Sequence, residues 1–255
     1  MRRRGLATLL LLLLVAGGGA AAQSATPTLT VYAAADLQLA FGEITPLFEK
    51  AAGARVILVV GSTGNLAKQI EHGAPADVFF AANESFVDDL QAAGATIPQT
   101  RALYAQGRIV FATPRTSAVI VRELADVLKP EVRRVAIANP AHAPYGRAAQ
   151  EALERAGVWE KVKPKLVYGE NIRHTLQFVQ TGAVEAGIVA LSIADVPEVR
   201  YVAIDPTLHK PLNQVVAVVK RSPRPELGTA FIQFVNGAEG RPIMKRYGFL
   251  LPGEF

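Results

Sequence analysis

Hydroxyl side chains and glycines gather where an apolar run gives way to a helical pattern. The segment Gly61-Ser62-Thr63-Gly64-Asn65 places two hydroxyls and two glycines directly before a helix. A helix N-terminus offers N–H groups without intrahelical partners and the positive end of the helix dipole. This junction therefore has the donors of an anion-binding site. An ordinary Ser or Thr N-cap would explain the same residues.

Three other junctions have a similar design. Asp36 follows the small residues Ala33–Ala35, the segment Asn139–Arg147 carries two prolines and Gly146, and Gly169–Ile172 precedes a further helix. Taken alone, Asp36 is typical of an N-cap, and the proline-containing segment is typical of a rigid connection. In open α/β sheets, ligands bind beyond the carboxyl ends of the strands. If these junctions converge, they would bind a small anion without a cationic side chain.

The sequence lacks the motifs of covalent and metal catalysis. It contains no G-x-S-x-G, no G-x-x-x-x-G-K-[ST], no H-E-x-x-H and no cysteine. The four histidines, His72, His142, His174 and His209, do not have metal-ligand spacing. We therefore expect a protein that is not an enzyme and needs neither a metal nor a cofactor. An enzyme would have to use Asp36 or His142 as its nucleophile or base.

Strand and helix patterns alternate along the chain, which predicts an α/β fold with sheets covered by helices on both faces. Strands are expected at 29–35, 55–60, 77–82, 107–113, 134–138, 166–168, 186–191, 201–204 and 214–219. Helices are expected at 37–52, 66–71, 83–90, 119–128, 146–156, 172–181 and from 226 to about 247. We expect Pro46 to kink or split the first helix and Asn83 to cap the third.

The first 22 residues have the pattern of a secretory signal peptide. Three arginines, Arg2 to Arg4, precede the apolar run Leu6–Ala16, and Ala20–Ala22 forms an Ala-x-Ala cleavage site. The formal charge of +5 falls to 5 − 3 = +2 without these arginines, so composition gives no case for nucleic-acid binding. The signal peptide predicts export. Because the sequence has no lipid-anchoring cysteine, we expect the exported protein to lie in the periplasm without a lipid anchor.

In their order along the chain, these junctions resemble the periplasmic molybdate-binding proteins of ABC importers. The resemblance extends over essentially the whole chain after residue 22 and rests on five segments: Val31–Ala35, Gly61–Ile70, Gly73–Phe79, Gly187–Val189 and Lys245–Phe249. It implies a hinged two-domain periplasmic binding protein with mixed sheets. Domain I would comprise residues 28–110 and 216–255, and domain II residues 111–215. It also implies a monomer that closes over molybdate or tungstate and delivers it to an ABC permease and ATPase complex.

The resemblance further implies a ligand held only by neutral donors, and it assigns their positions. The family's two hydroxyl donors fall on Asp36 and on Thr63 with Ser62 beside it, its two backbone donors on Tyr145 and Ile172, and its tyrosine on Ala190. Two of these positions depart from the family, because neither Asp36 nor Ala190 carries a hydroxyl. Tyr145 is a candidate for the missing phenol, since both positions belong to the same side of the cleft.

Asp36 is the harder departure, because an ionised carboxylate repels a dianion. Three arrangements would relieve the repulsion. Asp36 could turn away and cap its helix, which we place first, or a raised pKa could keep it protonated as a donor. Alternatively, the ligand itself could carry the proton, as phosphate-like and arsenate-like anions do near neutral pH and molybdate does not. A sensor module that binds the anion for a signalling partner is a further alternative.

Overall fold

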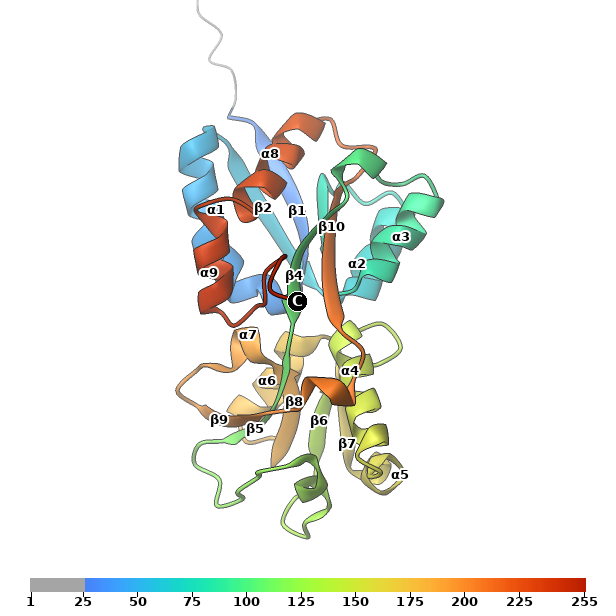
Figure 1. Ribbon diagram of the computed structural model, residues 1–255, viewed down its shortest axis with the longest axis vertical. Coiled ribbons are helices and arrows are strands. Elements are labelled where there is room, and N and C mark those ends of the chain that lie inside the picture. Colours follow the sequence, from blue (N-terminus) through green and yellow to red (C-terminus); the bar gives the residue numbers. More distant parts are fainter. Residues whose placement is uncertain (1–25) are drawn as a thin grey trace, which may run out of the picture.

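Two five-stranded sheets organise the chain in this computed structural model, which describes residues 26–255 (Figure 1). The first sheet has the order β2-β1-β3-β10-β4 and the second the order β7-β6-β8-β5-β9. The strands are β1 Thr28–Ala34, β2 Arg55–Gly61, β3 Val78–Ala81, β4 Ala102–Gly107, β5 Ile109–Pro114, β6 Val135–Ala138, β7 Leu166–Gly169, β8 Ala186–Ala190, β9 Val199–Ala203 and β10 Leu212–Val218. The predicted signal peptide, residues 1–22, lies outside the described residues.

Helices cover both faces of each sheet, as the alternating pattern predicts (Figure 1). The α-helices are α1 Gln38–Ala52, α2 Thr63–Glu71, α3 Glu84–Ala92, α4 Pro144–Arg155, α5 Trp159–Val162, α6 Ile172–Gln180, α7 Leu191–Ala194, α8 Pro225–Val235 and α9 Gly240–Arg246. Short 3-10 helices lie at Ala35–Leu37, Pro98–Thr100, Leu124–Leu128, Lys163–Lys165 and Pro206–Leu208. Within residues 26–255, no helix is long and apolar enough to cross a membrane.

Each sheet is mixed, because one strand in each runs against its neighbours. Strand β10 is antiparallel to β3 and β4, and β5 is antiparallel to β8 and β9. The chain passes between the sheets at Arg108, between β4 and β5, and returns between β9 and β10. The domain limits expected from the sequence, 110/111 and 215/216, fall inside β5 and β10 rather than at these crossings.

Parallel pairing brings the junctions together in pairs. Ala34 at the end of β1 lies in register with Gly61 at the end of β2. In the second sheet, Ala138 at the end of β6 lies in register with Gly169 at the end of β7. The segments that follow these strands therefore emerge side by side, one pair from each sheet, at the boundary between the two halves of the molecule (Figure 1).

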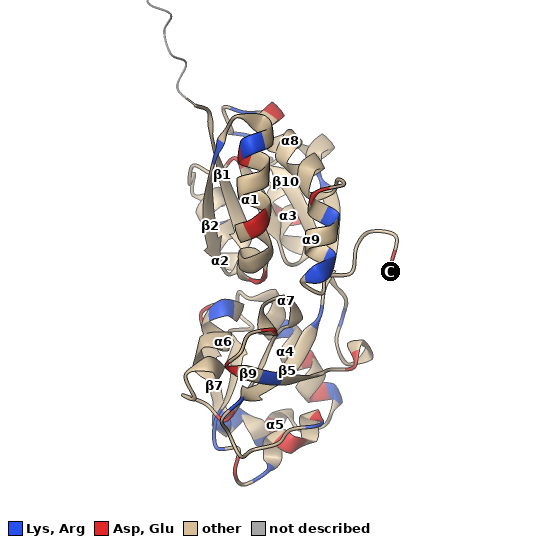
Figure 2. Cartoon of the chain, turned by 90° about the vertical axis from the view of Figure 1, so that its left-hand side faces the viewer, with Lys and Arg blue, Asp and Glu red and all other residues tan. Residues whose placement is uncertain are grey.

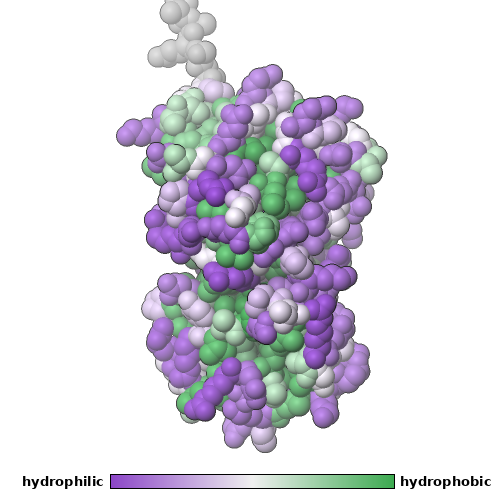
Figure 3. All heavy atoms as spheres, in the orientation of Figure 1, coloured by the Kyte–Doolittle hydropathy of each residue, from purple (hydrophilic) through white to green (hydrophobic). Residues whose placement is uncertain are grey.

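Separate apolar clusters stabilise the two halves. On one face of the first sheet, Phe41 and Phe48 of α1 pack edge-to-face on Phe231 of α8, with ring centroids 5.7 and 4.9 Å apart. A third cluster lies under α2 and α3, and the second sheet has its own core. Figure 3 shows a waist between the two lobes, and Figure 2 shows basic and acidic residues interspersed over both.

Pro46 does not split α1, which is continuous: the proline lies on the exposed face while Phe41, Ile44 and Phe48 hold the other face in the core. The alternative expectation, a kink at Pro46, stays a prediction. Three other expectations about the elements are wrong. The strand expected at 107–113 begins only at Ile109, after the crossing, and β4 before it was not expected.

The other two corrections concern helices. The helix expected at 119–128 is only the 3-10 turn Leu124–Leu128, which starts at a capping box formed by Glu123 and Asp126. The C-terminal helix is interrupted between α8 and α9, where a Cβ on Gly240 would come within 2.3 Å of the carbonyl oxygen of Val235. The predicted cap of α3 is confirmed, because the Asn83 side chain accepts from the N–H of Ser85.

Candidate functional site

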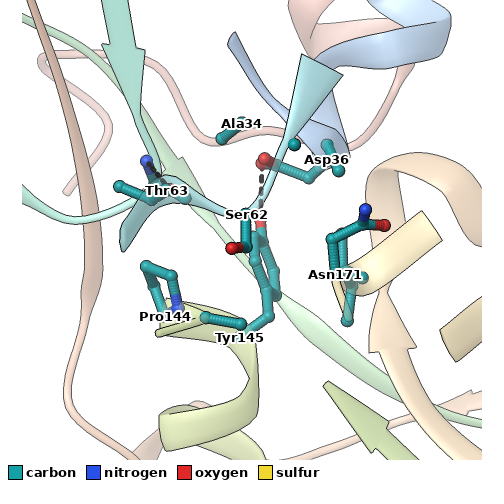
Figure 4. A pocket seen from close by; sticks show the side chains of 12 residues that line it. Ala34, Asp36, Ser62, Thr63, Pro144, Tyr145 and Asn171 are labelled. Carbon is teal, nitrogen blue, oxygen red and sulfur yellow. Dashed lines mark hydrogen bonds between the residues drawn. The ribbon is translucent and has the colours of Figure 1, made fainter. Parts of the chain in front are cut away.

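A small cavity lies between the two halves, where the four junctions converge (Figure 4). All five residues assigned from the sequence line it: Asp36, Ser62, Thr63, Tyr145 and Ile172. Its other lining residues are small or neutral: Ala34, Ala35, Gly61, Ala82, Ala143, Pro144 and Asn171. Ala190, where the family has a tyrosine, does not line it and instead pairs with Ile109 inside the second sheet.

Three helices of eight residues or more begin at the cavity: α2 from the first half, and α4 and α6 from the second. Ser62 is the N-cap residue of α2, yet its side chain makes no capping hydrogen bond. The first-turn N–H groups of Thr63, Tyr145 and Ile172 have no acceptor within their own helices. Their dipoles add positive potential at the same place, so the cavity favours an anion.

The two hydroxyls at the start of α2 both make hydrogen-bonding contacts. Oγ1 of Thr63 accepts from the N–H of Ala82 at 3.1 Å, which leaves the hydroxyl hydrogen free to donate elsewhere. Oγ of Ser62 lies 2.9 Å from Nδ1 of His142, which belongs to the other half of the molecule. Within residues 26–255, no Lys or Arg lines the cavity, so neutral donors dominate its chemistry.

Asp36 does not cap a helix, so the arrangement that we placed first is wrong. Neither the 3-10 helix Ala35–Leu37 nor α1 has a side-chain cap. Instead, Oδ2 of Asp36 accepts from the hydroxyl of Tyr145 at 2.8 Å (Figure 4). It also accepts from Nε2 of Gln214 at 2.7 Å. Two side chains from distant elements thus hold this carboxylate, and it does not cap a helix.

Burial changes the acidity of Asp36. Its side chain is 1% exposed, and the loss of solvation raises its pKa from 3.8 to about 6. The hydrogen bonds from Gln214 and Tyr145 favour the ionised form and offset part of this rise. Its second oxygen, Oδ1, is buried without a hydrogen-bond partner in the described part of the chain.

Tyr145 reaches the crossing between the two sheets. Its hydroxyl lies 3.0 Å from Nε2 of Gln214 on β10, and a Cβ on Gly107, at the end of β4, would come within 2.1 Å of it. Only glycine leaves room for the phenol at that position. The hydroxyl is donated to Asp36, so a direct role for Tyr145 toward a ligand remains a prediction.

Contacts across the cleft show that the two halves are closed on each other. The N–H of Gly64 on α2 donates to the carbonyl of His142 at 2.9 Å. At the rim, Nδ2 of Asn65 donates to Oε1 of Glu170 at 3.0 Å, and Oγ of Ser192 on α7 donates to the carbonyl of Asp36 at 2.9 Å. A ligand in this cavity would be shielded from bulk water.

Comparison with known proteins identifies the family of this chain. The sequence pattern of the family described as bacterial extracellular solute-binding protein matches residues 29–250. The chain belongs to this family. The molybdate-binding protein ModA of Escherichia coli K12 is 33% identical over 231 residues, covering 88% of this chain and 89% of that protein. ModA of Azotobacter vinelandii is 32% identical over 232 residues, covering 86% and 88% respectively.

The fold of this solute-binding protein is also matched by a solved structure. The periplasmic molybdate-binding protein of Azotobacter vinelandii superimposes with a TM-score of 0.82 at 27% identity, covering 88% of this chain and 99% of that one. The resemblance to molybdate-binding proteins and the two-domain α/β fold predicted from the sequence are thereby confirmed.

Three residues around the cavity were not singled out from the sequence. Gln214 is fully buried and directly precedes the apolar residues of β10, but no local pattern marks it. Asn171 caps α6 by accepting from the N–H of His174 at 2.9 Å and also lines the cavity. Tyr104 donates to the carbonyl of Ala81, and no local pattern connects it to the site. Within residues 26–255, no group of acidic and histidine side chains could hold a metal ion.

Proposed function

We propose that this solute-binding protein captures molybdate or tungstate in the periplasm for an ABC importer. The observation that carries the proposal is the closed cavity at the N-termini of α2, α4 and α6, whose donors are hydroxyls and backbone N–H groups. Molybdate is the ligand named for the E. coli and A. vinelandii relatives. Neutral donors suit a dianion that must later be released, because they bind it without forming an ion pair.

Closure is the step that an importer would recognise. The two crossings, at Arg108 and between β9 and β10, are the hinge about which we propose that two domains open and close. Opening would break the contacts of Gly64 and Ser62 with His142. A permease and ATPase complex would bind the closed form of a secreted monomer, and neither a covalent step nor a nucleic-acid partner is part of the proposal.

Selection by size tests this function. Molybdate and sulfate share charge and tetrahedral shape, but sulfate is smaller, so fixed donors in a closed cavity would leave some bonds to sulfate long. Each poorly made bond to a charged group costs about 1.5–3 kcal/mol. Isothermal titration should therefore show molybdate and tungstate bound at least about tenfold more tightly than sulfate. Equal affinities for the three anions would refute the proposal.

A protonated tetrahedral anion such as phosphate or arsenate is the second candidate ligand. It is favoured by one observation, the buried Oδ1 of Asp36 at the cavity, which can accept a hydrogen bond but cannot donate one when ionised. Including phosphate and arsenate in the same titrations separates the two candidates.

A further inference from the structure

The two oxygens of Asp36 have unequal surroundings. Oδ2 is occupied by two donors from distant elements, Tyr145 on α4 and Gln214 on β10. Oδ1 is buried and has no partner among the described residues, while Asp36 itself lines the cavity. Because Asp36 lines the cavity and its Oδ2 already accepts two hydrogen bonds, a ligand that bonds to this carboxylate would have to use Oδ1.

An unprotonated oxyanion presents only acceptors, and so does an ionised carboxylate. Placing the two together in a closed cavity without a cation would leave two repelling acceptors and no hydrogen bond. A single proton between them converts this repulsion into one hydrogen bond. Asp36 is thus compatible with an anion only when the pair holds one proton.

We infer that the cavity binds its oxyanion together with one proton, shared between Oδ1 of Asp36 and an oxygen of the ligand. This inference rests on the proposed function. Tyr145 and Gln214 are positioning residues, because their donation to Oδ2 directs the proton to Oδ1. The proton is taken from solvent when the ligand is molybdate, and it arrives on the ligand when the ligand is hydrogen phosphate. The chemistry at Oδ1 is the same for both.

Tyr104 and Tyr145 are titratable groups that interact with the Asp36 charge, and His142, whose Nδ1 lies 2.9 Å from Oγ of Ser62, is a further titratable group beside the cavity. The pKa values of Tyr104 and Tyr145, from β4 and α4, are raised well above their usual range by burial and by the Asp36 charge, so both stay protonated. The segment Ala35–Leu37 packs on α1, α6 and α7, whose titratable side chains are Glu43, Glu49, Lys50, Arg173 and His174. None of these is among the groups that shift the pKa of Asp36.

The test measures protons directly, with molybdate as the probe. Titration calorimetry in two buffers of different ionisation enthalpy gives the number of protons taken up on binding. We expect about one proton per molybdate at pH 8, where Asp36 with its pKa of about 6 is ionised before binding. Affinity should then fall about tenfold for each pH unit between pH 7 and 8.5.

Two variants separate this role from a structural one. Asp36→Asn can keep an oxygen toward Tyr145 and Gln214 and place Nδ2, a permanent donor, at the position of Oδ1. It should bind molybdate without proton uptake and with a flat pH profile, while binding hydrogen phosphate more weakly than wild type does. The matched control is Glu170→Gln, which removes a rim carboxylate that accepts from Asn65 and should keep the proton uptake.

The outcomes distinguish the inference from the function on which it rests. If no oxyanion binds to the wild type, the proposed function fails. If molybdate binds tightly with no proton uptake and a flat pH profile, the function stands and the inference is overturned. Proton uptake that persists in Asp36→Asn would likewise overturn it.

Discussion

Gly64→Ala should block closure of the cleft while leaving the open protein intact. The N–H of Gly64 donates across the cleft to the carbonyl of His142, and a Cβ at this position would come within 2.7 Å of that same oxygen. The obstacle is backbone, so it cannot rotate away as a side-chain end could. The two halves could therefore not close fully, because one half must move away from the other to make room for the added methyl group.

The structure sets the size of the effect. Overpacking a closed contact costs about 1–3 kcal/mol, and weakening the Gly64 hydrogen bond costs about 1 kcal/mol more. The sum of about 2–4 kcal/mol corresponds to a roughly 30- to 700-fold loss of molybdate affinity. Stability should change in the opposite direction, since Gly64 lies within α2 and alanine is favoured over glycine in a helix by up to about 1 kcal/mol.

Titration calorimetry with molybdate and urea unfolding of the unliganded protein measure the two effects separately. Gly42→Ala is the matched control, because Gly42 lies within α1 and a Cβ there meets no atom of the described residues within 4 Å. The control should gain stability and keep its affinity. If Gly64→Ala binds molybdate as tightly as the control does, the contact with His142 does not belong to the bound state and the closure argument is refuted.

Two other predictions follow from the buried polar contacts. Thr63→Val should lower molybdate affinity about tenfold to a hundredfold by removing one donor, and it should also cost about 1–3 kcal/mol of unliganded stability because the N–H of Ala82 loses its acceptor. Unchanged affinity in calorimetry would show that the hydroxyl only supports the fold. The raised pKa of Asp36, about 6 against 3.8 unfolded, means that the folded protein holds this proton more tightly. Its contribution to stability is therefore fully present below about pH 4 and is lost as pH rises through 6, by about 3 kcal/mol. The free energy of unfolding of Asp36→Asn should lack this decline, and parallel pH profiles for the two proteins would contradict the assigned pKa.

The alternation of elements could be predicted from the sequence because it depends on local patterns of apolar residues. The errors fall where tertiary structure decides. The crossing at Arg108 separates β4 from β5, and nothing local marks that these two strands join different sheets. Pro46 is tolerated in α1 because the helix is held by its buried face, which is again a tertiary effect.

In the candidate site too, features that depend on the local sequence could be predicted, and features that depend on residues far along the chain could not. The junctions that contain Ser62, Thr63 and Ile172 could be found because their local pattern predicts a helix N-terminus, and the family resemblance then assigned the individual residues. The state of Asp36 could not be predicted, because its donors Tyr145 and Gln214 are 109 and 178 residues away. The local pattern predicts that Asp36 caps a helix, whereas in the structure its carboxylate accepts hydrogen bonds from these two distant side chains.

These distant donors also connect proton binding to closure. Tyr145 stands on α4 in the second half, whereas Asp36 follows β1 in the first, so their hydrogen bond exists only when the halves meet. Burial, the main cause of the raised pKa, depends on the same contact. Opening would return Asp36 toward water and lower its pKa, and the shared proton would then be released. Because a dianion beside an ionised Asp36 is repelled, opening the cleft would weaken ligand binding both by removing donors and by restoring the charge of Asp36.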